Sequence, residues 1–214
     1  GSMLEFALEE IPSFGVGRIA SLFMYPLRFG ELMEALGDQP LYQMIFEADE
    51  KKPMDSVLHA RLLEKFKIYQ MIGGMPAVVE AYRLGRDVRA CQKILEALSV
   101  GLQDDFAKYK KRSPTLRLRE VFRSVPFQAG GKFKYSNISE QGSMVSYPAY
   151  KEALDLLVRA GLVYKVTHTS ARGIPLGAQI DPKKFKVILF DLGLHQRLIG
   201  LNLSELILSK STDL

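Results

Sequence analysis

The sequence has one cysteine, no tryptophan and only three histidines among its 214 residues. A lone cysteine, Cys91, excludes an internal disulfide, and no secretory leader pattern is present, so we expect a cytoplasmic protein. No apolar run reaches the roughly 18 residues that a membrane-spanning helix needs, so no membrane partner is expected. What is present, 47% hydrophobic and 25% charged residues, is ordinary for a globular protein with a buried core.

The common catalytic and ligand-binding patterns are also missing. The three histidines lie far apart and none has a second histidine at helical spacing, which argues against a metal site. No Gly-x-Ser-x-Gly elbow is found. Gly130-Gly131-Lys132 resembles the end of a phosphate-binding loop, but Phe133 stands where Ser or Thr is required. We therefore expect no catalytic residues, no metal and no cofactor in this chain. The histidines are His59, His168 and His195.

Positive charge is concentrated in one stretch. The net charge is +5, yet residues 106–135 hold nine basic residues and a single acid, Glu120. Such asymmetry is typical of a surface that meets phosphates or an acidic partner, and the alternative is a solvated helix face. The candidate nucleic-acid or partner-binding residues of this stretch are Lys108, Lys110, Lys111, Arg112, Arg117 and Arg119.

The helical period dominates residues 61–112. Gly73-Gly74 is expected to end one helix, and Pro76 to open the next in its first turn, which makes a tight corner. A long helix over 87–112 follows, with an apolar stripe on which Cys91 lies, so this thiol is expected to be buried rather than reactive. A shorter helix through Leu116 and Val125 is expected to end at Pro126.

The pattern changes after Pro126. The elements expected next, in order, are a short helix starting at Asn137, an amphipathic helix ending at Gly161, a strand over 162–167, a loop over 168–182 and a strand over 185–190. This order is typical of a winged helix-turn-helix. The expected fold is therefore mainly α with a small β component, in which a helical, lid-like region precedes a winged-helix domain.

The second helix of that unit would be the one to enter a DNA groove, but its exposed charges cancel. Two acids, Glu152 and Asp155, offset Lys151 and Arg159, and acids oppose phosphate. If DNA binds, the basic stretch and the wing residues His168 and Arg172 are better candidates than this helix. Winged helices also serve as protein-interaction modules, so the partner stays open.

Several short motifs together resemble a known family. They include Val16-Gly17-Arg18, Tyr25-Pro26-Leu27, Gly73-Gly74-Met75-Pro76, Lys132-Phe133-Lys134-Tyr135-Ser136 and Asp191-Leu192-Gly193-Leu194. Their order over residues 2–200 resembles prokaryotic AAA-family P-loop ATPases whose C-terminal half is the domain of unknown function 4143.

The resemblance implies a parent chain with Walker motifs upstream, which would bind ATP and Mg²⁺, and a nuclease-like domain downstream. Arg18 would then be a nucleotide-sensing arginine that stabilises phosphate charge. The alternative is a structural ion pair of Arg18 with Glu9 or Glu10. Arg28 departs from the small polar residue usual in that family.

We expect four segments on this basis. Residues 1–30 would be the end of an ATPase core or a linker, residues 31–126 a helical lid-like domain, residues 127–200 a winged-helix domain, and residues 201–214 the start of a truncated element. The chain would be a non-catalytic regulatory or interaction fragment that the parent ATPase moves against DNA or a protein partner. The alternatives are a stand-alone winged-helix DNA-binding protein, with a helical region for self-association, and a defence component that binds protein.

Overall fold

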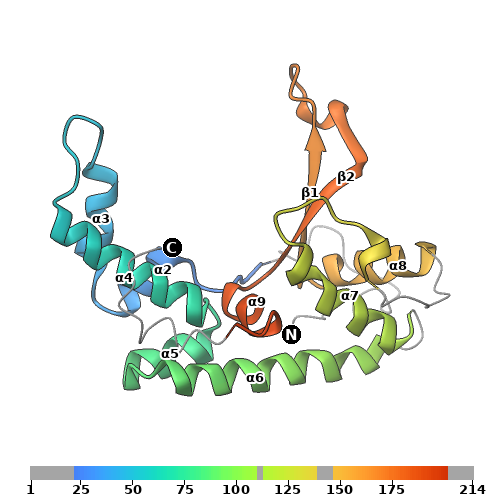
Figure 1. Cartoon of the computed structure of the whole chain (residues 1–214), viewed down its shortest axis with the longest axis horizontal. Coiled ribbons are helices and arrows are strands. Elements are labelled where there is room, and N and C mark those ends of the chain that lie inside the picture. The colour runs from blue at the N-terminus through green and yellow to red at the C-terminus, as the bar shows by residue number, and fades with distance from the viewer. Residues whose placement is uncertain (1–21, 110–112, 139–146, 202–214) are drawn as a thin grey trace. The chain divides into compact units, whose positions relative to one another are not determined.

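The structure is a computed structural model that describes residues 22–109, 113–138 and 147–201 (Figure 1). Within these residues the chain is mainly helical and has one two-stranded antiparallel sheet, which confirms the mainly α prediction with a small β component. The described α-helices are α2 (Phe29–Ala35), α3 (Gln39–Glu47), α4 (Ser56–Ile72), α5 (Pro76–Gly85), α6 (Val88–Asp105), α7 (Thr115–Gln128), α8 (Tyr147–Arg159) and α9 (Leu192–Leu198). The strands are β1 (Val163–Thr169) and β2 (Ile180–Leu189), and the 3-10 helices are η1 (Phe106–Tyr109), η2 (Tyr135–Asn137) and η3 (Leu176–Gln179).

The described residues divide into two compact units. One contains residues 22–24 and 101–190, and we call it the hairpin unit; the other contains residues 25–100 and 191–201, and we call it the helical unit. The boundary between them falls within α6. The four-segment division expected from the sequence remains a prediction.

The helical unit has a small apolar core that aromatic rings cover. Met33, Leu41 and Leu62 are buried together. Phe29 lies over this cluster and makes edge-to-face contacts with Tyr42, at 5.7 Å between centroids, and with Phe66, at 5.2 Å. Such edge-to-face pairs add stability beyond the area that they bury. The short helices α2 and α3 are thereby held on α4.

The corner between α4 and α5 forms as the sequence predicts. Gly73 adopts a positive φ of 68° at the end of α4, and its N–H donates to the Tyr69 carbonyl at 2.8 Å. Pro76 occupies the first turn of α5, where its missing N–H leaves no hydrogen bond unmade. The start of α4 is capped by the Asp55 carboxylate, which accepts from Val57 N and Leu58 N.

The hairpin unit is built on α7 and α8. Its core contains Phe106, which packs edge-to-face on Phe122 at 5.4 Å, and the buried leucines of α8. The Tyr150 hydroxyl of α8 donates to Glu120 of α7 at 2.9 Å. The prediction that α7 ends at Pro126 is wrong, because this helix continues to Gln128. Pro126 is buried in the last turn, where the loss of one N–H interrupts little of the hydrogen-bond ladder.

The two strands form a long hairpin (Figure 1). Their register pairs Val163 with Leu189 and Thr167 with Phe185, and then shifts so that His168 faces Asp181. A local turn lies at this shift, in which the Asp181 carboxylate accepts from Lys183 N at 3.0 Å. The predicted strand over 185–190 is therefore too short, since β2 begins at Ile180, before this bulge.

The structure also confirms that Cys91 is buried, with an exposed fraction of 0%. Burial raises the pKa of its thiol to about 11. Because the thiolate is the reactive form, we expect iodoacetamide to label Cys91 at pH 8 at least tenfold more slowly in the native protein than in denaturant. Mass spectrometry of the alkylated protein measures both rates. Equal rates would contradict the buried position.

A lysine-rich face as the candidate functional site

A short extended segment lies on the free side of β2. Phe133 N donates to the Phe185 carbonyl at 3.0 Å, which places this segment beside β2, opposite β1. Both phenylalanines are buried and their ring centroids lie 5.7 Å apart. The backbone at Lys134 is extended, and the Tyr135 ring packs on Phe133 at 5.2 Å. The side chains of residues 133 and 135 thus point into the core.

Alternation then directs the neighbouring lysines outward. In extended chain, successive side chains point to opposite faces. The same tripeptide, Lys-Phe-Lys, occurs at 132–134 and at 184–186, and the two phenylalanines are the residues joined by the hydrogen bond. Lys132, Lys134, Lys184 and Lys186 are all exposed. We call these four residues the lysine face.

Little negative charge offsets this face. Lys184 pairs with Asp181 at 3.4 Å between exposed side chains, whereas Lys132, Lys134 and Lys186 make no ion pair with any residue that the structure describes. The hydrogen bond from Lys183 N, assisted by Lys184, lowers the pKa of Asp181. This carboxylate therefore stays charged at neutral pH but neutralises only one ammonium group. Ammonium groups without a partner carboxylate are well suited to bind an anion.

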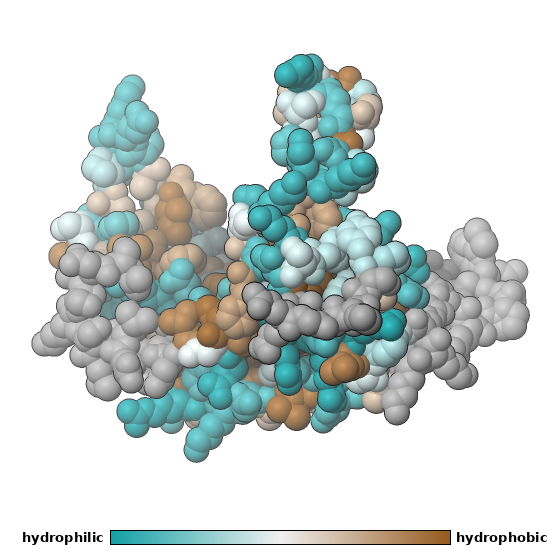
Figure 2. All heavy atoms as spheres, turned by 45° about the vertical axis from the view of Figure 1, so that its right-hand side comes forward, coloured by the Kyte–Doolittle hydropathy of each residue, from teal (hydrophilic) through white to brown (hydrophobic). Residues whose placement is uncertain are grey.

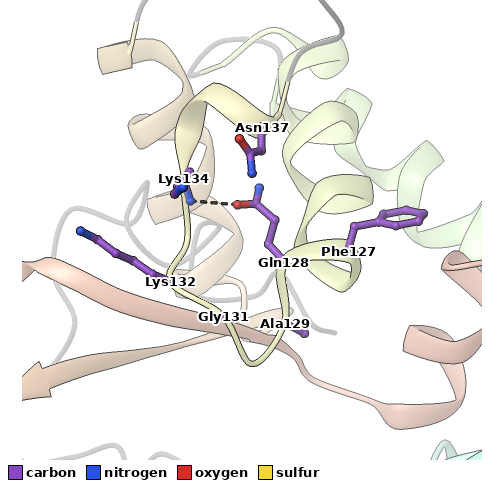
Figure 3. Close-up of a pocket in the computed structure, with 7 residues that line it drawn as sticks. All are labelled: Phe127, Gln128, Ala129, Gly131, Lys132, Lys134 and Asn137. Carbon is purple, nitrogen blue, oxygen red and sulfur yellow. Dashed lines mark hydrogen bonds between the residues drawn. The ribbon is translucent and has the colours of Figure 1, made fainter.

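An open pocket of about 390 Å³ adjoins the lysine face (Figure 3). Gln128 supports its wall, since its Oε1 accepts from Lys134 N at 2.8 Å and its Nε2 donates to the Ser124 hydroxyl at 2.8 Å. No carboxylate lines the pocket, and its polar groups are amides and ammoniums, which suit a phosphate oxygen. The lining residues are Phe127, Gln128, Ala129, Gly131, Lys132, Lys134 and Asn137.

The charge of the whole hairpin unit agrees with that of the face. Residues 101–190 contain 16 Lys and Arg against 7 Asp and Glu, a net charge of +9, while the complete chain carries +5, so the remainder carries −4. Hydrophilic side chains cover the lower part of the hairpin in Figure 2. The asymmetry that the sequence shows is thus a property of this unit.

The predicted basic residues have unequal positions. Arg119 is tied to the end of α6, because its Nη2 lies 3.1 Å from an Asp104 carboxylate oxygen and its Nε donates to the Gln103 carbonyl. Arg123 Nε likewise donates to Gln103 Oε1 at 2.8 Å. Both arginines join α7 to the end of α6. Arg117 is half-buried, and Arg172 and His168 are exposed on the hairpin.

Other predicted residues fall outside the described parts of the chain. These are Arg18, Lys110, Lys111 and Arg112. For Lys108, which belongs to η1, the structure describes the backbone but not the side chain. Sequence reasoning counted Lys132 and Lys134 within the basic stretch but did not select Lys184 or Lys186. The repeated Lys-Phe-Lys tripeptide is the signal that could have found them.

The described residues contain neither a cluster of metal ligands nor a helix that could span a membrane. No group of three or more potential metal ligands is found among them. None of their helices has the length and apolarity that crossing a membrane requires.

One family matches more than half of the chain. Its description is Domain of unknown function (DUF8612), and the match covers residues 63–205. The chain belongs to this family. No curated protein and no solved structure matches the chain. The DUF8612 region includes the corner at Gly73-Gly74 and all of the lysine face.

Membership in the DUF8612 family corrects the resemblance drawn from the sequence. The inference of an AAA-family ATPase with domain of unknown function 4143 is wrong, because the matching family is a different one. The motifs that carried it have local structural reasons. Gly73-Gly74-Met75-Pro76 is the corner between two helices, and Lys132-Phe133-Lys134 is an edge segment of the sheet. Such packing devices recur in unrelated proteins.

Proposed function

We propose that the hairpin unit binds the phosphate backbone of duplex DNA through the lysine face. The observation that carries this proposal is the convergence of two Lys-Phe-Lys tripeptides at the Phe133–Phe185 hydrogen bond. Their four exposed ammonium groups are offset by one carboxylate, Asp181. A row of cations that displaces the counterions of DNA supplies most of the affinity of non-specific binding.

The order of elements in the hairpin unit supports a winged-helix arrangement. After α7 come the extended segment at Phe133, η2, α8 and then the hairpin of β1 and β2. The segment at Phe133 adds to the β2 side of the hairpin, and α8 packs on both α7 and β1. Helix, strand, helix and a two-stranded wing in this order are the arrangement from which winged helices bind DNA.

The charges of α8 favour binding with little sequence preference. Its exposed Lys151 and Arg159 are offset by the exposed Glu152 and the half-buried Asp155, so the formal charges of these four side chains sum to zero. A helix that reads bases normally presents basic and amide side chains to the groove. We therefore infer that phosphate contacts from the lysine face dominate, with a dissociation constant in the range of about 10⁻⁶ to 10⁻⁴ M at physiological salt.

The salt dependence of binding tests this proposal. We expect the logarithm of the association constant to fall linearly with the logarithm of salt concentration, with a slope of about −4 if each of four lysines meets one phosphate. Fluorescence anisotropy with a labelled duplex measures it. Replacement of Lys132, Lys134 and Lys186 together by Ala should bring the slope to about −1, since each lost phosphate contact removes about one unit.

The helical unit offers a matched control of the same charge. Lys51, Lys52 and Lys67 are exposed, and their joint replacement by Ala also removes three positive charges. This variant should keep the wild-type slope. Equal losses in the two triple variants would show that net charge alone drives binding, and an unchanged slope in the first variant would refute the assignment of the lysine face.

A further inference from the structure

The tip of the hairpin is held by one side chain. The Gln179 amide oxygen accepts from Arg172 N at 2.7 Å and from the Ser170 hydroxyl at 2.8 Å, and its Nε2 donates to the Gly173 carbonyl at 3.0 Å. Thr169 adds a hydrogen bond from its hydroxyl to the Leu176 carbonyl at 3.3 Å. Because one amide makes three bonds across the loop, the backbone of residues 170–179 has a defined shape.

This loop and the first residue of β2 present aliphatic side chains to solvent. Ile174 has an exposed fraction of 97%, Leu176 of 54% and Ile180 of 44%. Hydrophobic residues are visible at the far end of the hairpin in Figure 2. A single exposed aliphatic residue needs no explanation, but three at the end of one hydrogen-bonded loop are typical of a binding element. Arg172, which precedes Ile174 in the same loop, is also exposed.

We infer that the hairpin tip is a wedge for the DNA minor groove, in which Ile174 enters a base step and kinks the duplex while Arg172 binds at the groove floor. This inference rests on the proposed function. Proteins that kink DNA from the minor groove insert aliphatic side chains between base pairs. Arginine favours a narrow minor groove because the negative potential is enhanced there.

Charge complementarity favours DNA over other occupants of the tip. On β2, Lys183, Lys184 and Lys186 lie between the tip and the core of the hairpin unit, so a ligand that covers the tip also meets a row of cations. A duplex offers both components, phosphates for the lysines and an apolar step between bases for the isoleucine. Gln179 is then a positioning residue, since it shapes the loop without reaching the bases.

The test separates bending from binding in the full chain. A duplex of about 20 base pairs, whose ends lie about 70 Å apart when it is straight, carries a donor and an acceptor at its ends and a fluorescent adenine analogue in the centre. With wild-type protein at saturation we expect a rise of about twofold in end-to-end energy transfer, which corresponds to a kink of about 60°. The adenine analogue should brighten as it unstacks.

Two variants should lose the kink and keep the binding. For Ile174→Ser and for Gln179→Ala we expect less than about a fivefold loss of affinity in anisotropy, because the phosphate contacts remain, but no rise in energy transfer and no brightening at saturation. Leu84→Ser is the matched control, because Leu84 of α5 is also largely exposed, at 71%. It should behave as wild type in both measurements.

The outcomes distinguish the two proposals. Wild-type protein that binds a straight duplex overturns the wedge and leaves phosphate binding by the lysine face intact. Ile174→Ser protein that still kinks the duplex, or Leu84→Ser protein that fails to, also overturns it. Absence of duplex binding at low salt refutes the proposed function itself, and binding to vesicles of anionic lipid instead would assign the tip to a membrane surface.

Discussion

Replacement of Gly74 by Ala is expected to unfold the helical unit or to lower its free energy of unfolding by more than about 3 kcal/mol. An added Cβ would lie 2.0 Å from the Leu27 carbonyl oxygen and 2.7 Å from Leu27 N. The same two residues are joined by a hydrogen bond from Leu27 N to the Gly74 carbonyl at 2.7 Å. Backbone atoms cannot move aside as side chains do, so the cost should exceed the 1–3 kcal/mol or so of ordinary overpacking.

Gly85 provides the matched control for this substitution. It lies at the end of α5 in the same unit, and an added Cβ meets nothing within 4 Å. Gly85→Ala should therefore stabilise the unit by about 0.5–1 kcal/mol, because alanine loses less backbone entropy on folding. Urea denaturation followed by far-ultraviolet circular dichroism measures both changes. A Gly74→Ala midpoint equal to that of wild type would show that Leu27 does not pack against this corner.

The corner between α4 and α5 shows how far local rules extend. That Gly73-Gly74 ends a helix and that Pro76 starts another follow from backbone preferences of a few adjacent residues. The reason that Gly74 must be glycine lies elsewhere, at the backbone of Leu27, which an added Cβ would overlap. The N–H of Gly74 also depends on a distant residue, since it donates to Asp191, which is 117 residues further along the chain. No pattern within a window of ten or twenty residues contains that information.

The candidate site likewise combines a feature that local sequence predicts with one that only contacts between distant residues determine. The sequence locates positive charge in residues 106–135, but it cannot tell which basic side chains are used within the unit. Arg119 and Arg123 bond to Gln103 and Asp104, whereas Lys132 and Lys134 face outward. The lysine face also needs β2, and the Phe133–Phe185 pairing joins segments 52 residues apart.

Removal of the Asp191 carboxylate is the second change with a large expected effect. Asp191 is 3% exposed, and its two oxygens accept from Gly74 N at 2.8 Å and from Leu194 N at 2.9 Å. It thus caps α9 and fastens this helix to the corner after α4. Asp191→Ala leaves the Gly74 and Leu194 N–H groups buried without this acceptor. The free energy of unfolding should therefore fall by about 3 kcal/mol, of which about 1 kcal/mol comes from the lost cap at Leu194 N and about 1–3 kcal/mol from the unpaired donor Gly74 N.

Asp191→Asn separates the loss of hydrogen bonds from the loss of charge. The amide keeps one acceptor oxygen, but its NH₂ group would face a donor, so urea denaturation should show a loss between those of wild type and Asp191→Ala. A loss equal to that of Asp191→Ala would mean that the single remaining oxygen accepts no hydrogen bond. A loss of less than about 0.5 kcal/mol in both variants would contradict the role of this carboxylate as a fastener.

The pH dependence of stability in wild type and Asp191→Asn shows whether the charge of Asp191 stabilises or destabilises the folded chain. Burial raises the pKa of Asp191 in the folded chain, although hydrogen bonds from Leu194 N, Gly74 N and Gly193 N oppose the shift. A carboxyl group whose pKa is raised on folding stabilises the folded state below its unfolded pKa of about 3.9, and this contribution declines as the pH rises through the raised value.

Asn does not titrate. The stability difference between wild type and Asp191→Asn should therefore be largest near pH 4 and should narrow towards pH 7. A difference that widens over this range would mean that the three N–H donors outweigh burial and that the charged form is the one that the fold prefers.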